Sequence, residues 1–288
     1  MVLVTEENLP RREHVLILLT GATGGLGTLV AERLAGQGDV VLGTRAPERV
    51  RVPLPVRPLD FDVPDTLAGA FAGVDVLLLV SAGYGEDDTV IARHGAAVDA
   101  AERAGVRHIV YTSLTGDGDH LPYALPHRWT ERRLREGSAD WTILRNGLYA
   151  ELLGQLAAPA PDGRLTAPLG RGRLAAVARA DLADAAAAVV LAPAAHAGRT
   201  YELVGEEALG GEDLARAHGP GVVYESEPLA LARERLTASG AAPFQVPMVL
   251  GTCSAVAAGF LDRTGGDLRA LLGRAPRSAM DVITGLSG

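Results

Sequence analysis

The chain has 288 residues and 48% of them are apolar, enough to bury the core of one large α/β domain with an elaboration, or of two small domains. The formal net charge is −8 and no basic run is long enough to follow a nucleic-acid backbone, so nucleic acid is not expected as a ligand. The single cysteine, Cys253, excludes an intrachain disulfide and a cysteine-based zinc site, and no bound metal is expected.

The first residues, 1–13, are polar without any apolar period and are predicted to be a flexible extension. The apolar run Val15–Leu19 is too short for the core of a secretory signal and leads into a glycine turn, as a buried strand does. The alanine-rich stretch Leu182–Ala197 is too short to span a bilayer and contains Asp184. We therefore expect a cytoplasmic protein without a membrane partner.

Apolar stretches alternate with helical patterns up to about residue 150. The predicted strands are Val15–Leu19, Asp39–Thr44, Val56–Asp60, Asp75–Val80, Arg107–Leu114 and Trp141–Arg145, and the helices between them are Gly25–Leu34, Asp65–Phe71, Thr89–Ala104 and Pro126–Glu136. Near-continuous apolar strands separated by helices indicate a parallel sheet that is covered on both faces. Residues 14–150 are therefore predicted to form a doubly wound, Rossmann-type domain, with contributions from about residues 175–204.

Beyond residue 150 the pattern is less regular. A helix is predicted at Ala178–Leu191 and a strand at Thr200–Val204, and Gly and Pro turns separate several helices after them. Residues 151–174 and 205–288 are therefore predicted to form a smaller, mainly helical portion. Ligands of such α/β sheets bind above the carboxyl ends of the strands, so this portion is expected to bind the substrate.

The glycine turn between the first strand and the first helix predicts a dinucleotide site. Gly21 ends the strand in a tight turn, Gly24 lets the backbone approach the phosphates, and Gly27 lets the new helix pack closely. The free N–H groups of the helix then face an anion. The predicted pyrophosphate contacts are Gly21, Thr23, Gly24, Gly25, Leu26 and Gly27.

The residues after the second and third strands bear on the choice of cofactor. Arg45 stands where an arginine can hold a 2′-phosphate and an acidic residue would hold a 2′-hydroxyl, so NADP(H) is favoured over NAD(H). Arg49 and Arg51 are alternatives for this role. Asp60 and Phe61 are candidates for contacts with the adenine. The alternative is that Asp60 only forms a turn and Phe61 only packs in the core.

The residues after the fourth and fifth strands are candidates for the nicotinamide end. Ser81, Ala82 and Gly83 have small or no side chains, so the backbone there can run close beside the cofactor ribose. Thr112 and Ser113 are expected near the nicotinamide. A hydroxyl there can hydrogen-bond a substrate carbonyl, or it can only hydrogen-bond other groups of the protein at the end of the strand.

Three titratable residues, His120, Tyr123 and His127, lie near this region in the sequence. Each can donate a proton or have a structural role only.

Several segments together resemble the NmrA-like class of atypical short-chain dehydrogenase/reductases, most of all its bacterial NAD(P)H:quinone oxidoreductase type 2 subgroup. The resemblance covers about residues 14–205 and rests on the segments Thr20–Gly27, Arg45, Asp60–Phe61, Tyr111–Leu114, His127, Thr130–Glu131, Leu144–Glu151, Ala178–Asp181 and Tyr201–Leu203. It implies NADPH bound over the glycine turn and Arg45. It also implies that Asn146, Gly147, Tyr149 and Glu151 line the nicotinamide and substrate region.

The chain departs from this family at its lysine. All 27 basic residues are arginine, and Arg132 replaces the lysine that follows the Thr-Glu pair in the family. Arg132 can still hydrogen-bond a ribose hydroxyl or a carbonyl, but it is a poor proton donor. The Tyr-x-x-x-Lys pair of ordinary short-chain dehydrogenases is also absent, as it is from the quinone reductase subgroup.

The resemblance therefore implies an NADPH-dependent reductase of a quinone or a related conjugated carbonyl, with Asn146, Tyr149 and Thr112 orienting the acceptor. Two alternatives stay open, a reductase or isomerase that tailors an aromatic natural product and a non-catalytic NADP(H)-sensing regulator. A homodimer is compatible with the sequence.

Overall fold

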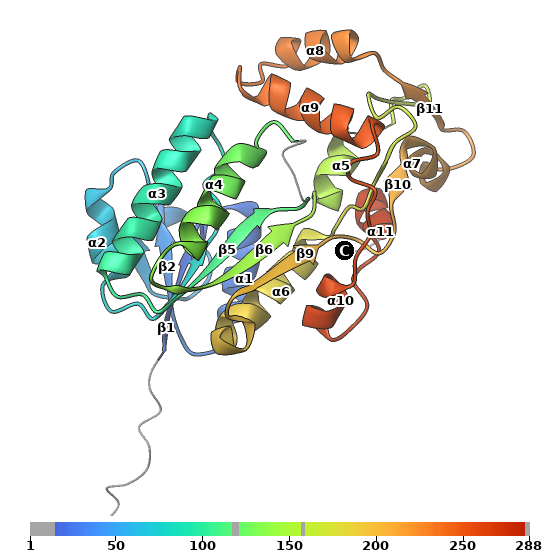
Figure 1. Ribbon diagram of the computed structural model, residues 1–288. Coiled ribbons are helices and arrows are strands. Elements are labelled where there is room, and N and C mark those ends of the chain that lie inside the picture. The colour runs from blue at the N-terminus through green and yellow to red at the C-terminus, as the bar shows by residue number, and fades with distance from the viewer. Residues whose placement is uncertain (1–14, 117–120, 157–158, 286–288) are drawn as a thin grey trace, which may run out of the picture.

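The structure is a computed structural model that describes residues 15–116, 121–156 and 159–285. Its centre is a seven-stranded parallel sheet with the order β3-β2-β1-β4-β5-β6-β9 (Figure 1). The strands are β1 (Leu16–Thr20), β2 (Asp39–Thr44), β3 (Val56–Pro58), β4 (Val76–Leu79), β5 (His108–Leu114), β6 (Asp140–Asn146) and β9 (Arg199–Leu203). The winding reverses between β1 and β4, which opens a crevice at their carboxyl ends. The predicted doubly wound fold is confirmed.

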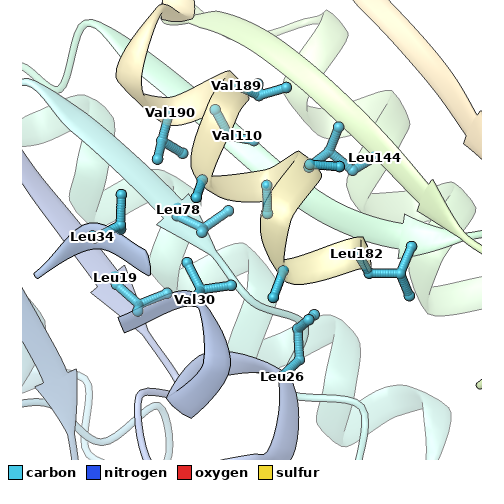
Figure 2. Packing of buried hydrophobic residues seen from close by; sticks show 14 of the residues in the cluster. Leu19, Leu26, Val30, Leu34, Leu78, Val110, Leu144, Leu182, Val189 and Val190 are labelled. Atoms are coloured by element: carbon cyan, nitrogen blue, oxygen red, sulfur yellow. The ribbon is translucent and has the colours of Figure 1, made fainter. Parts of the chain in front are cut away.

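Helices cover both faces of this sheet. One layer contains α1 (Gly25–Leu34), α6 (Arg179–Leu191) and α10 (Asp267–Leu272), and the other contains α2 (Asp65–Phe71), α3 (Asp87–Arg103) and α4 (Ala124–Arg135). Figure 2 shows the apolar side chains of α1 and α6 meeting those of the strands. The alternation of side chains along β1 places Leu18 in one layer and Leu19 in the other, and both are fully buried. This double burial explains the uninterrupted apolar runs in the sequence.

The C-terminal portion gathers beyond the carboxyl ends of β5, β6 and β9 (Figure 1). Its elements are α5 (Ala150–Leu156), β7 (Arg164–Ala167), β8 (Arg173–Leu174), β10 (Leu209–Gly210), α7 (Gly211–His218), β11 (Val223–Ser226), α8 (Leu229–Ala238), α9 (Gln245–Ala257) and α11 (Ala279–Thr284). The short strands form two pairs, β7 with β11 and β8 with β10. These elements enclose a separate apolar cluster that contains the buried thiol of Cys253. Two 3-10 turns, η1 (Pro47–Arg49) and η2 (Pro193–His196), complete the fold.

No helix in the described part of the chain is long and apolar enough to cross a membrane, and no cluster of three or more His, Cys, Asp or Glu side chains there is placed to hold a metal ion. The predicted extension at residues 1–13 and the candidate His120 lie outside the described residues.

Candidate cofactor and substrate site

The glycine turn joins β1 to α1 at the crevice. Gly21 adopts a positive φ of 64°, which only glycine tolerates readily, and its carbonyl accepts a hydrogen bond of 2.9 Å from the N–H of Gly24. A Cβ at Gly27 would lie 2.1 Å from the Gly21 oxygen, so the helix can begin only because Gly27 has no side chain. Gly24 and Gly25 are exposed, and their backbone is open to a ligand.

A cleft of about 600 Å³ extends from this turn across the carboxyl ends of β1, β2 and β4. It is lined by nine residues that the sequence predicted, namely Gly21, Thr23, Gly24, Arg45, Asp60, Phe61, Ser81, Ala82 and Gly83. Arg49, one of the two alternatives to Arg45, also lines it. The loops that follow four neighbouring strands, β3, β2, β1 and β4, therefore meet as the fold requires.

An arginine of α3 closes one side of the cleft. Arg93 makes two hydrogen bonds to the carboxylate of Asp62, of 2.6 and 2.7 Å, and a third of 2.9 Å to the carbonyl of Tyr84. The hydrogen bond from Arg93 also holds the pKa of Asp62 below its usual value. Arg93 thus ties the loop after β3 to the loop after β4, and the sequence did not identify it because it lies inside an ordinary helical pattern.

The two hydroxyls at the end of β5 point in opposite directions. The Oγ1 of Thr112 accepts a hydrogen bond of 2.9 Å from the N–H of Ser81, so it supports the loop that lines the cleft. The Oγ of Ser113 donates a bond of 2.6 Å to the buried Glu131 of α4. The side chain of Ser113 therefore faces the α4 layer, and its contact with the cofactor stays a prediction.

His127 also lies in the α4 layer, 8% exposed, where its Nδ1 is 2.8 Å from the hydroxyl of Tyr111. Burial lowers the pKa of His127 to about 4, so the ring is neutral at neutral pH. The role of His127 as a proton donor stays a prediction, which its buried, neutral ring does not favour. His94 of α3 lies beside it, and its Nε2 accepts a hydrogen bond of 3.0 Å from the N–H of Ala82.

Arg132 lies in the last turn of α4, whose first turn is the one near the carboxyl edge of the sheet. Its side chain is 81% exposed and pairs with Glu136 at 2.8 Å. The role of Arg132 at the substrate stays a prediction, and its side chain pairs with Glu136 here.

The segment after β6 approaches the glycine turn from the other side. Asn146 is 6% exposed, and its Oδ1 has no hydrogen-bond partner among the described residues. The N–H of Gly147 donates to the carbonyl of Leu203, and a Cβ there would lie 2.9 Å from Val177. Tyr149 lies under the guanidinium of Arg179, 4.7 Å from Cζ to the ring centroid.

Glu151 accepts hydrogen bonds of 3.1 and 3.3 Å from the backbone N–H of Arg179. It therefore caps the start of α6, and this contact places Arg179 beside the turn. The orphaned Oδ1 of Asn146 and the open glycine cradle fit a bound dinucleotide, because both offer polar groups that the protein leaves unsatisfied.

The C-terminal portion contacts a loop that lines the cleft. Phe244, just before α9, meets Tyr84 edge to face with ring centroids 5.0 Å apart. The hydroxyl of Tyr123 lies 3.2 Å from that of Thr252, so α9 also contacts the chain before α4. These contacts place the start of α9 beside the loop after β4, which lines the cleft.

A second cavity of about 530 Å³ lies beyond β9 and shares no lining residue with the cleft. Leu148, Glu202 and Phe260 are among the residues that line it. Because Leu148 directly precedes Tyr149, this cavity is a second possible place for a substrate.

Comparison with known proteins gives consistent results. The sequence matches a family model described as NAD(P)H-binding over residues 21–193. Quinone oxidoreductase 2 of Escherichia coli (strain K12) is 34% identical over 224 residues, which cover 73% of this chain and 77% of that protein.

Two solved structures resemble almost the whole chain. Triphenylmethane reductase of Citrobacter sp., complexed with NADP(H), has a TM-score of 0.86 and 29% identity, covering 93% of this chain and 99% of that one. The NADPH-dependent quinone oxidoreductase of Escherichia coli, complexed with NADPH, has a TM-score of 0.85 and 31% identity, covering 94% and 100%.

Proposed function

The chain belongs to the NmrA-like family of NAD(P)H-binding oxidoreductases, and from this premise we propose that it is an NADPH-dependent reductase of a quinone or a related conjugated carbonyl. The observation that carries the proposal is the cleft of about 600 Å³ whose lining includes both the glycine turn and Arg45. The relatives add support, since one is a quinone oxidoreductase and another a triphenylmethane reductase, each seen with a phosphorylated dinucleotide.

Arg45 and Arg49 favour NADPH over NADH. Arg45 is exposed at the end of β2, and both arginines line the cleft. Their guanidinium groups can form charge-assisted hydrogen bonds with a 2′-phosphate, which NADH lacks. NADH would leave these two cations without an anion.

The chain contributes positioning rather than acid catalysis. Bound NADPH supplies the hydride that a carbonyl acceptor receives. We infer that Asn146, whose Oδ1 has no partner among the described residues, and Tyr149 orient that acceptor, while Thr112 holds the Ser81 loop in place. An electron-poor quinone accepts a hydride without a strong acid, and water can protonate the product oxygen. This agrees with the interior position of His127 and the remote position of Arg132.

The test is to follow NADPH absorbance with purified protein and a panel of quinones, with cofactor binding measured by calorimetry. We expect quinone-dependent oxidation of NADPH that exceeds oxidation of NADH. Tight NADPH binding without turnover of any acceptor would contradict the reductase and leave a dinucleotide sensor. Turnover confined to one elaborate aromatic carbonyl would favour a tailoring enzyme.

A further inference from the structure

Arg179 is the first residue of α6 and lies against the start of α1. A Cβ built on Gly25 would lie 2.9 Å from Nη1 of Arg179 and 3.3 Å from its Cζ. The guanidinium therefore occupies the space that a side chain at Gly25 would need. Neither residue is close to the other in sequence, and only the packing of α1 beside α6 brings them together.

Among the described residues, the guanidinium of Arg179 has no acidic partner. Its Nε is buried without a hydrogen-bond partner, and its Cζ lies 4.7 Å from the ring centroid of Tyr149. The nearby carboxylate of Glu151 is occupied by the backbone N–H of Arg179. Arg93 and Arg133, in contrast, each pair with carboxylates.

The position is electrostatically unfavourable without an anion. The N-terminus of α1 carries the positive end of the helix dipole, no acidic residue stands in its first turn, and Gly24 offers no side-chain cap. A cation placed beside this end is repelled by it. A phosphate between the two would receive hydrogen bonds from both, which removes the repulsion.

We propose that Arg179 is a further cofactor-binding residue, which grips the pyrophosphate of the dinucleotide from the α6 side of the glycine turn. The inference rests on the NADPH binding in the proposed function but not on the identity of the acceptor. The ring of Tyr149 packs against the guanidinium, and Glu151 accepts hydrogen bonds from the backbone N–H of Arg179 and so fixes the position of that residue. The first half of the chain thus cradles the phosphates and the second half supplies their counter-charge.

Two probes separate the pyrophosphate from the rest of the cofactor. NADPH contains the pyrophosphate, whereas adenosine 2′-monophosphate contains the adenine and the 2′-phosphate alone. We expect Arg179→Gln to weaken NADPH binding about 10- to 100-fold by calorimetry, as loss of a charge-assisted contact does. Binding of adenosine 2′-monophosphate should stay unchanged, and the salt dependence of NADPH binding should become shallower.

Arg199 provides a matched control, because its Cζ lies 5.6 Å from the ring centroid of Tyr201 at the opposite edge of the sheet. Arg199→Gln should bind both probes as the wild type does. If Arg179→Gln does not fold, Arg179→Lys keeps the positive charge but loses the paired N–H donors of the guanidinium. We then expect the affinity for NADPH alone to fall about 3- to 10-fold.

Wild-type affinity for NADPH in a folded Arg179 variant, or an equal loss for both probes, would overturn the inference. These results are independent of turnover. An Arg179-dependent affinity in a protein that reduces no quinone would keep this inference and contradict the proposed reaction.

Discussion

The backbone N–H of Ala82 donates a hydrogen bond of 3.0 Å to Nε2 of His94, so a buried histidine holds a loop that lines the cofactor cleft. The tautomer follows from the neighbouring contacts. Thr130 donates its hydroxyl proton to the carbonyl of Pro126 at 2.7 Å, so its Oγ1 accepts from Nδ1 of His94 at 2.8 Å. Nε2 then carries no proton, and only the neutral ring can hold the loop.

This arrangement predicts an acid-sensitive stability. Burial, with His127 and Arg93 nearby, lowers the pKa of His94 to about 3. The unfolded chain binds this proton near pH 6.5, so the free energy of unfolding falls as the pH drops from there toward 3, by at most about 1.4 kcal/mol per pH unit from this group. We expect His94→Gln to lose less stability than the wild type between pH 7 and pH 5 in urea titrations. Parallel losses in the two proteins would contradict the assignment.

The sequence predicted the elements of the central sheet and its covering helices best. The bounds of β2, α1 and α2 agree with the prediction, because an apolar run or an amphipathic period with clear end signals defines each of them. The short strands β7, β8, β10 and β11 have two to four residues each and pair with distant partners. No period can be recognised over so few residues, and their pairing depends on the tertiary fold.

The same contrast applies to the candidate site. Loops after β1, β2, β3 and β4 could be placed because the carboxyl ends of parallel strands share one edge. Thr112 and Ser113 were both assigned to that edge, although successive side chains of a strand point to opposite faces, so only one of them can support the cleft. Arg93 and Arg179 were not identified, since their roles depend on contacts between segments far apart in the chain.

Removal of Arg45 is expected to change cofactor preference. Arg45→Ala should raise the Kd for NADPH about 10-fold or more and leave that for NADH nearly unchanged, because only NADPH offers a 2′-phosphate to this guanidinium. Fluorescence titration with both cofactors measures the two values. Arg51→Ala is a matched control, since Arg51 donates to the carbonyl of Glu48 and does not line the cleft. An equal loss for both cofactors would refute the role of Arg45.

Glu131 is expected to be the main electrostatic support of α4. Burial alone would raise its pKa, but hydrogen bonds from Arg145 and Ser113 and the charge of Arg128 outweigh this effect and lower the pKa to about 2. Glu131→Gln removes the buried carboxylate that Arg128 and Arg145 share and leaves Arg145 with Glu202 alone, and we expect the free energy of unfolding to fall by about 3 kcal/mol.

The matched control for Glu131 is Glu136→Gln, which breaks the exposed pair with Arg132 and should cost less than about 1 kcal/mol. Urea unfolding of both variants at pH 7 gives the comparison, and similar losses would contradict the prediction. The contribution of Glu131 should disappear as the pH falls from about 4.5 toward 2, since the folded state then loses its advantage in keeping the carboxylate ionised.

The contact between Tyr84 and Phe244 distinguishes the two possible locations of the acceptor. If the acceptor lies in the part of the cleft beside Tyr84 and Phe244, Phe244→Ala removes the ring that packs against Tyr84 there and should raise the KM for the quinone about 2- to 10-fold. Phe260→Ala truncates an aromatic ring of the second cavity instead and should leave that KM unchanged. Steady-state kinetics at saturating NADPH measures both variants. A raised KM in the Phe260 variant alone would move the acceptor to the second cavity, because the ring at position 244 would then contribute nothing to the bound substrate.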